Sequence, residues 1–182
     1  MTELWEKEIE SKKIFQGRLI SVRVDTVEMP DGKKSTREIV EHPGAVAVIA
    51  ITQDQELILV RQFRKAAGEI VLELPAGVPN KGERGEETAR RELEEETGYF
   101  AKKIKKVCAG YASPGYSNEV LQFYLAEDMN KMKQKTDEDE FVEVDLIDVE
   151  TCVDLLKQGK IKDNKTIVGI LLAEKHLKGE LW

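Results

Sequence analysis

The chain has 182 residues, which is enough for one globular domain with a sizeable core and a small additional region. Hydrophobic residues make up 41% of the sequence, and this share excludes a wholly disordered protein. The formal net charge of -7 argues against general binding to nucleic acids or to acidic membranes, so we expect neither as a partner.

The amino-terminal region is predicted to form a β-hairpin. Residues 14–29 alternate in part between apolar and polar side chains, which is typical of a strand. A turn signal begins at Pro30, and residues 35–40 follow as the partner strand. An isolated hairpin buries little apolar surface, so this one must pack on the rest of the chain or on a second subunit. A Pro-Gly pair then marks a boundary, and the two predicted regions are residues 1–43 and residues 44–182.

The rest of the chain contains further strand and helix patterns. The predicted strands cover residues 45–52, 57–63, 70–74, 103–110, 120–126 and 141–147. The predicted helices cover residues 86–97, 149–157 and 166–177, and Asp163 or Asn164 caps the last of them. Because strands come in runs rather than in strict alternation with helices, we predict an α+β fold in which helices sandwich a mixed sheet.

The two cysteines do not suggest a metal site. Cys108 and Cys152 lie far apart and have no metal-ligand spacing, and their apolar contexts predict buried free thiols. The sequence carries no signal-peptide pattern and no long apolar span. We therefore expect a cytoplasmic protein that does not interact with membranes.

Most of the functional information lies in residues 77–99, which read GVPNKGERGEETARRELEEETGY. Specified residues stand at fixed intervals in the pattern G-x5-E-x7-R-E-U-x-E-E-x-G-U, where U is apolar or aromatic. The part from Glu86 to Thr97 is rich in good helix formers, and Gly98 stands where a helix stop is expected. The segment is therefore predicted to be a loop followed by a helix.

Three carboxylates lie along one face of this predicted helix. Glu92, Glu95 and Glu96 are spaced i, i+3 and i+4, so their charges repel each other. A hard divalent cation relieves that repulsion, and Mg²⁺ prefers oxygen ligands of this kind. Glu92 and Glu96 are the first candidates for metal ligands, followed by Glu95, while Arg91 can pair with Glu95 and orient it.

The alternative is a solvated surface helix with many charges, which is the usual interpretation of a Glu-rich run. Two features argue against it. Gly77 and Glu83 also fall at the specified distances, and the apolar, tightly turning segment 70–75 is expected of a strand that leads into a functional loop.

The pattern resembles the Nudix box, the signature of hydrolases that cleave nucleoside diphosphates linked to another group, and every specified position is matched. This resemblance implies an α/β/α sandwich. It extends over nearly the whole chain and is greatest to the ADP-ribose pyrophosphatase branch, in which the amino-terminal hairpin mediates dimerisation and reaches the partner's site. The segments that carry it are VRQFR at 60–64 with ELPAG at 73–77, SPGYS at 113–117, and the acidic run 137–140 with 141–144.

The resemblance also implies roles for individual residues. The backbone carbonyl of Ala76 matches a family metal ligand. Arg64 matches a residue that binds the substrate pyrophosphate through its bidentate fork, although a surface arginine at a strand end is the alternative. Pro114 and Gly115 shape the ribose pocket, and Glu119 accepts hydrogen bonds from ribose hydroxyls unless it is simply solvated.

The remaining implied roles concern contacts with the nucleoside and the identity of the general base. Arg37, Glu38 and His42 match positions that contact adenine or ribose. The family often has an aromatic residue where Arg37 stands, so Arg37 either stacks on the base through its guanidinium plane or is a solvated strand residue. Glu140 matches the proposed general base and Glu138 is the alternative, with Glu95 and Arg91 as further catalytic candidates.

The expected reaction is hydrolysis of the pyrophosphate bond of ADP-ribose to AMP and ribose 5-phosphate. It needs Mg²⁺, or Mn²⁺ as the alternative, with two or more ions per site. The expected partner besides this small-molecule substrate is a second copy of the chain, in a homodimer. Two other functions remain open: hydrolysis of another nucleoside diphosphate derivative, such as a nucleotide sugar or a dinucleotide, and non-catalytic sensing of ADP-ribose.

Overall fold

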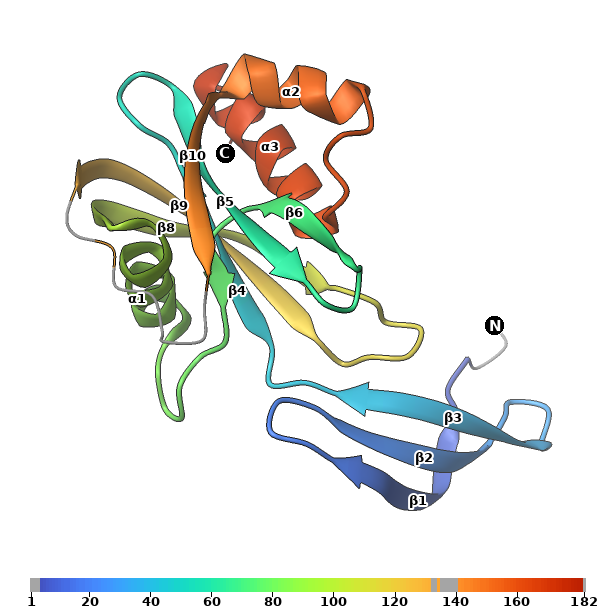
Figure 1. Cartoon of the computed structure of the whole chain (residues 1–182). Coiled ribbons are helices and arrows are strands. Elements are labelled where there is room, and N and C mark those ends of the chain that lie inside the picture. Colours follow the sequence, from blue (N-terminus) through green and yellow to red (C-terminus); the bar gives the residue numbers. More distant parts are fainter. Residues whose placement is uncertain (1–3, 132–133, 135–140, 182) are drawn as a thin grey trace. The chain divides into compact units, whose positions relative to one another are not determined.

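The computed structural model describes residues 4–131, 134 and 141–181 (Figure 1). The chain divides into two compact units. The amino-terminal unit consists of residues 1–44 and 110–121, and the main unit consists of residues 45–109 and 122–182. In the described part of the chain, no helix is both long and apolar enough to cross a membrane.

The amino-terminal unit contains an antiparallel sheet of three strands in the order β1-β2-β3. The strands are β1 (Lys7–Gln16), β2 (Ser21–Glu28) and β3 (Lys34–Glu41). The prediction of one strand over residues 14–29 is therefore wrong, because a turn separates β1 from β2 and the Gly17 N–H donates to the Ile20 carbonyl at 2.8 Å. Sequence patterning missed β1 because most of its residues are charged or polar, and every position is exposed.

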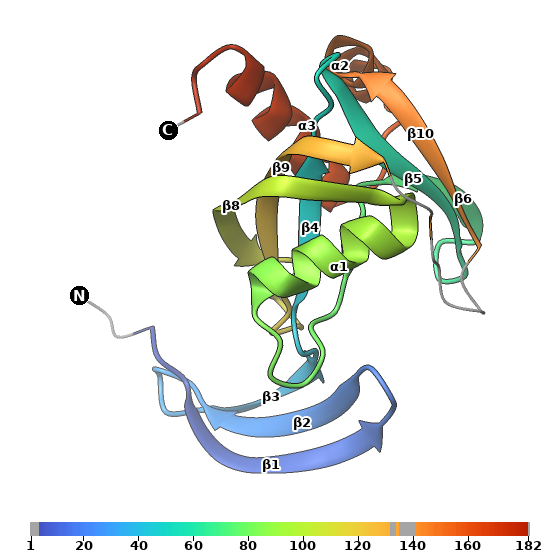
Figure 2. The same ribbon diagram turned by 90° about the vertical axis from the view of Figure 1, so that its left-hand side faces the viewer.

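The main unit contains two sheets and three helices. Its first half holds β4 (Ala45–Ala50), β5 (Glu56–Arg64), β6 (Glu69–Glu73), β7 (Ala76–Gly77) and α1 (Gly85–Thr97). Its second half holds β8 (Tyr99–Tyr111), β9 (Val120–Lys131), β10 (Val142–Asp148), α2 (Val149–Lys157) and α3 (Asn164–Leu177), with the ends of β8 and β9 running into the other unit. The strand orders are β7-β4-β9-β8 and β10-β5-β6. Figure 2 shows α1 on one side of β4 and α3 on the other, and both helices contact this strand.

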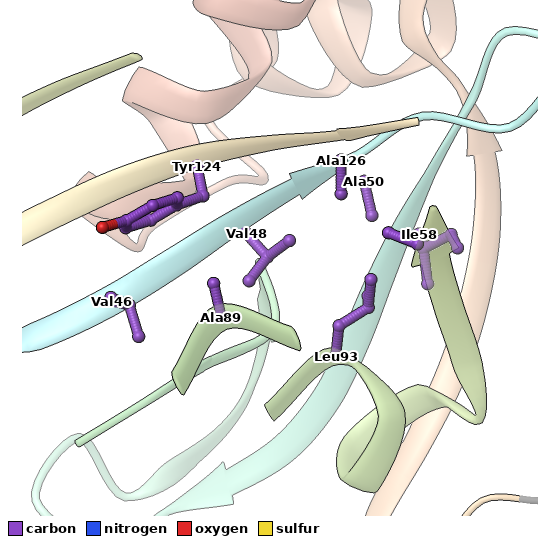
Figure 3. Close-up of a cluster of buried hydrophobic side chains, with 9 residues drawn as sticks. Val46, Val48, Ala50, Ile58, Ala89, Leu93, Tyr124 and Ala126 are labelled. Carbon is purple, nitrogen blue, oxygen red and sulfur yellow. The ribbon is translucent and has the colours of Figure 1, made fainter. Parts of the chain in front are cut away.

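The core of the main unit is built around β4. All six residues of its AVAVIA sequence are buried, as expected for a strand that is covered on both faces. On one face, Val46, Val48 and Ala50 form a cluster with Ala89 and Leu93 of α1 (Figure 3). These two α1 residues are four positions apart and share one helical face. The packing fixes α1, and with it the carboxylates that the helix carries.

The helices agree well with their predicted positions. α1 ends at Gly98, which adopts the left-handed conformation with φ of 70° and donates its N–H to the Glu94 carbonyl at 2.9 Å. α3 begins at Asn164, and Asp163 is its cap because its carboxylate accepts the N–H of Thr166 at 2.9 Å. This observation decides between the two caps that the sequence left open.

The cysteines differ in their environments. Cys152 on α2 is fully buried as predicted, and its burial raises the pKa of the thiol to about 12. Cys108 is only partly buried, so the prediction of two buried thiols is wrong for this residue. It lies on β8, a strand that has exposed positions along most of its length.

Candidate active site

Gly77 and Glu92 meet where β7 passes the side of α1. A Cβ atom added at Gly77 would lie 1.9 Å from Oε1 of Glu92, far inside van der Waals contact. Only a residue without a side chain lets the backbone approach the carboxylate this closely. The sequence pattern specifies both residues, and their contact gives a physical reason for the glycine.

Arg91 is the centre of an ion-pair network that joins the loop before α1 to the second half of the helix. Its Nε and Nη2 donate to the two carboxylate oxygens of Glu83 at 2.9 and 3.0 Å. Its Nη1 donates to Glu95 at 2.9 Å and lies 2.8 Å from Oε1 of Glu92, and its Nη2 also donates to the Val78 carbonyl at 3.1 Å. One guanidinium therefore connects the loop to two of the three carboxylates on the helix.

The network changes the acidity of its members. The hydrogen bonds from Arg91 are the main reason why the pKa of Glu83 falls to about 2, and the backbone N–H of Asn80 lowers it further. The same pair raises the pKa of the Arg91 guanidinium above its ordinary value. The Arg91–Glu95 pair was expected from its i, i+4 spacing and is present. The Arg91–Glu83 pair, which joins residues eight apart, was not predicted.

A second contact holds the candidate metal ligands together. The side chain of Glu96 accepts the backbone N–H of Ala76 at 3.0 Å, and Glu96 is only 4% exposed. Together with the contact between Gly77 and Glu92, this brings two carboxylates of α1 to the short strand that carries the Ala76 carbonyl. All of these groups offer oxygen, the donor that Mg²⁺ prefers, so they fit the ion chemically.

Side chains alone do not complete a metal centre in residues 4–131, 134 and 141–181. No group of three histidine, cysteine, aspartate or glutamate side chains converges there as a metal site. Mg²⁺ is commonly held by one or two carboxylates together with substrate phosphates and water, so two carboxylates and a carbonyl still fit such a site. The exposed fraction of the Glu95 side chain is 39%, and its carboxylate accepts a hydrogen bond from Arg91.

Arg64, the candidate for pyrophosphate binding, forms a bidentate ion pair with Glu73. Its Nε and Nη2 donate to the two oxygens of Glu73 at 2.6 and 2.9 Å. Lys165 of α3 also donates to this carboxylate. Burial alone would raise the pKa of Glu73, but the hydrogen bonds and positive charges of these two cations hold it below its ordinary value. Sequence reasoning quoted Glu73 only within a motif and missed Lys165 entirely.

The amino-terminal unit brings together several of the residues predicted to bind substrate. Residues 116–118 attach to β3, since Val40 donates to the Tyr116 carbonyl at 2.7 Å and accepts the Asn118 N–H at 3.3 Å. His42 donates its backbone N–H to the Asn118 side chain at 2.8 Å, and its Nδ1 lies 3.5 Å from Oε1 of Glu119. The contact between His42 and Glu119 joins two candidates that are far apart in sequence.

Other predicted residues of this unit have their own surroundings. The guanidinium of Arg37 pairs with Glu6 and also donates to the Ser35 hydroxyl at 3.0 Å. Glu38 lies opposite Val24 in the sheet. Pro114 and Gly115 lie within a turn that the Ser117 N–H closes by donating to the Ser113 carbonyl at 2.9 Å. The two candidates for the general base, Glu138 and Glu140, lie outside the described residues.

The chain is similar to known proteins over most of its length. Residues 41–168 match the family described as NUDIX domain, and residues 6–40 match the nucleoside diphosphate sugar hydrolase N-terminal domain. The ADP-ribose pyrophosphatase of Bacillus subtilis (strain 168) is 48% identical over 172 residues, which are 93% of each chain. The methanol dehydrogenase activator of Bacillus methanolicus is 41% identical over 167 residues, 91% of this chain and 90% of that protein.

A solved structure supports the fold independently. The crystal structure of an ADP compounds hydrolase superimposes with a TM-score of 0.85 over 96% of this chain and 95% of the other. Its sequence identity is 23%, so the likeness concerns the fold. It confirms the predicted α+β sandwich.

Proposed function

The chain belongs to the Nudix family, and from that premise we propose that it hydrolyses the pyrophosphate bond of ADP-ribose to AMP and ribose 5-phosphate. The observation that carries the proposal is the contact of Ala76 with the buried carboxylate of Glu96, beside the contact of Gly77 with Glu92. It groups oxygen donors of the kind that hold the metal in phosphate chemistry. The name of the relative that is 48% identical supports ADP-ribose as the substrate.

We assign the metal site to the Ala76 carbonyl, Glu92 and Glu96, with Glu95 beside them. The proposed cofactor is Mg²⁺, with Mn²⁺ as the alternative and two or more ions per site. When bound, the metal supplies neutralisation of phosphate charge and a more acidic water molecule. Arg91 keeps Glu95 and Glu92 in place before the substrate arrives, because all three residues belong to one ion-pair network.

The chain's own groups orient the reactants. Arg64 binds the pyrophosphate, since its planar guanidinium matches the spacing of phosphate oxygens. A glutamate, Glu140 in the first instance and Glu138 in the second, accepts the proton of the attacking water. The water oxygen forms a bond to one phosphorus, and the bond from that phosphorus to the bridging oxygen breaks. The second phosphate leaves with that oxygen, giving the two monophosphate products.

The amino-terminal unit is proposed to recognise the nucleoside. His42 and Glu119 lie together in this unit. His42 is assigned to the adenine or the ribose, and Glu119 to the ribose hydroxyls. Arg37, Glu38, Pro114 and Gly115 complete the proposed set. The protein is proposed to act in the cytoplasm as a homodimer.

The test is release of phosphate monoesters from ADP-ribose in the presence of Mg²⁺, with Glu96→Gln beside the wild type. The substitution keeps the size of the side chain and removes one charge, and we expect kcat/KM to fall by about 100-fold or more. Glu94→Gln is the matched control, because Glu94 is the carboxylate two positions earlier on α1 that has no assigned role. Equal activity of Glu96→Gln and the wild type would contradict the metal assignment.

A second candidate function is hydrolysis of another nucleoside diphosphate derivative. The match of residues 6–40 to the nucleoside diphosphate sugar hydrolase N-terminal domain favours it specifically. A panel of nucleotide sugars and dinucleotides, assayed beside ADP-ribose, distinguishes the two by their kcat/KM values. Tight binding of ADP-ribose without multiple turnovers of any panel member would instead favour a sensor, although all the box carboxylates are present.

A further inference from the structure

Glu73 is a buried anion that holds two cations from distant parts of the chain. It is the last residue of β6 and is 2% exposed. One cation is Arg64, nine residues earlier, and the other is Lys165, 92 residues later on the first turn of α3. A buried carboxylate is stable only when it is paired and hydrogen-bonded, and here both of its oxygens are engaged.

Arg64 meets Glu73 through one edge of its guanidinium. The Nε and Nη2 atoms make the two hydrogen bonds, and within the described residues Nη1 makes none. The exposed fraction of the Arg64 side chain is 43%, against 3% for Glu73. The edge formed by Nη1 and Nη2 therefore stays available for a second bidentate interaction, which is the geometry that suits phosphate.

Lys165 is held rigidly at the start of α3. Its side chain is only 11% exposed, and it lies 3.0 Å from Asp163, the cap of the helix. The neighbouring Thr166 is fully buried, and its hydroxyl accepts the backbone N–H of Leu74 at 2.8 Å. The same helix turn thus fixes both the backbone next to Glu73 and the ammonium group that pairs with it.

This arrangement has an electrostatic consequence for Arg64. If Glu73 paired with Arg64 alone, one negative charge would offset the whole guanidinium charge and weaken its attraction for an anion. Because Lys165 also pairs with Glu73, the negative charge of this carboxylate is shared between two cations. Asp163 offsets part of the Lys165 charge but also caps the positive end of α3. Arg64 consequently keeps a larger share of its charge for a ligand, in a fixed orientation.

We propose that Lys165, acting through Glu73, is a positioning residue that aims the free edge of Arg64 at the diphosphate of the substrate. This inference rests on the proposed function, in which Arg64 binds the pyrophosphate. It adds the first turn of α3 to the substrate-binding machinery and assigns Lys165 a role in affinity for the diphosphate.

The test begins with steady-state kinetics of Lys165→Met in saturating Mg²⁺. We expect KM for ADP-ribose to rise about tenfold, with kcat changed by less than about threefold, because a mispositioned Arg64 binds substrate and transition state less well by similar amounts. Lys165→Arg keeps the charge and is expected to recover most of the affinity. A KM equal to that of the wild type in Lys165→Met would overturn the inference.

A matched control uses the other lysine–glutamate pair between the same two segments. Lys162 pairs with Glu69, but the exposed fractions of these side chains are 60% and 43%. Exposed pairs contribute little. Glu69 lies opposite Arg64 across β5 and β6, but in the described part of the chain the Arg64 guanidinium donates to Glu73 and not to Glu69. Lys162→Met should therefore keep the wild-type KM. An equal rise of KM in Lys162→Met would show a general charge effect and contradict the positioning role.

A double-mutant cycle separates positioning from a purely structural role. If Lys165 acts through Arg64, Lys165→Met in an Arg64→Ala background should change KM by less than about twofold. Effects that multiply in the double variant would contradict the inference. Should Lys165→Met fail to fold, Glu73→Gln tests the other link of the same arrangement, since it removes the ion pair that orients Arg64 and is expected to raise KM similarly.

The proposed function and this inference fail in different measurements. If the wild type hydrolyses a different nucleoside diphosphate derivative, the ADP-ribose assignment fails, and the same variants are compared on that substrate because the diphosphate is shared. If the wild type hydrolyses none, calorimetric Kd values for ADP-ribose replace KM. In each case a wild-type value in Lys165→Met overturns the inference, and a rise of about tenfold that disappears in the Arg64→Ala background supports it.

Discussion

Gly77 illustrates how a single residue couples backbone shape to a proposed metal ligand. The atom that an alanine would add there overlaps the carboxylate of Glu92, not the backbone of a neighbour. The carboxylate is the end of a flexible side chain, so it can rotate away at a cost of about 0.5–1.5 kcal/mol. The fold should tolerate the change, while the proposed metal ligand should not keep its position.

We therefore expect Gly77→Ala to lower kcat/KM by about 10- to 100-fold, while the free energy of unfolding falls by less than about 1.5 kcal/mol. Kinetics with ADP-ribose and urea unfolding measure the two effects. Gly110→Ala is the control, because among the described residues, apart from its two chain neighbours, no heavy atom lies within 4 Å of a Cβ at that glycine. A loss of stability large enough to account for the lost activity would contradict the prediction that Gly77→Ala affects the site more than the fold.

Glu83 should make the protein sensitive to acid. Its folded-state pKa of about 2 lies below the ordinary value of 4.5, so its stabilising effect is complete above pH 4.5 and is lost as the pH falls toward 2. The free energy of unfolding of the wild type should exceed that of Glu83→Gln by on the order of 2 kcal/mol near neutral pH and by clearly less near pH 3. Denaturant unfolding of both proteins at the two pH values measures this. A difference that is independent of pH would contradict the assignment.

At the scale of elements, α1 combines a core-facing stripe with a row of charged side chains. Ala89 and Leu93 join the cluster around β4, and Leu93 is fully buried. We expect Leu93→Ala to lower the free energy of unfolding by about 2–5 kcal/mol and to reduce activity, because the helix that carries Glu92 and Glu96 loses its anchor. Leu171→Ala, at a leucine that is 45% exposed on α3, should cost less than about 1 kcal/mol. Similar urea midpoints for the two variants would contradict this.

The sequence predicts elements well where the local pattern and the tertiary environment agree. α1 has good helix formers, a Gly98 stop and a two-residue apolar stripe, and its position was predicted to within one residue. β1 was missed because its pairing with β2 comes from backbone hydrogen bonds, which leave no apolar periodicity in an exposed strand. Its existence is decided by its neighbour rather than by its own side chains.

In the candidate site, too, the sequence predicts local spacing well and long-range contacts poorly. The box pattern identifies Glu92, Glu96 and Gly77, because their spacing is local and the helix makes them neighbours. The role of Lys165 depends on a contact with Glu73 across 92 residues, and one sequence without a fold gives no register for such a contact. Its physical signature, a lysine only 11% exposed with two acidic partners, is visible only in three dimensions.

At the scale of the whole molecule, the amino-terminal unit carries the surface proposed to form a homodimer. The sheet of the amino-terminal unit exposes apolar side chains, among them Ile9, Ile14 and Phe15 of β1, and such surface favours association. We expect light scattering at micromolar concentration to give the mass of a dimer. Ile14→Asp should shift the mass toward that of a monomer, while the same change at Ile70, which is more exposed but lies on β6, should not. A monomeric mass for the wild type would refute the proposal.

The hydrogen bond between Leu74 and Thr166 also has a consequence for biosynthesis. The residues that fix the segment before Ala76 are 92 positions downstream, so a ribosome making about 5–20 residues per second adds them roughly 5–20 s later. Until then, the nascent chain holds Glu73 with only one of its two cations. The segment that leads to Ala76 can therefore take its final hydrogen bonding only once the first turn of α3 has left the exit tunnel.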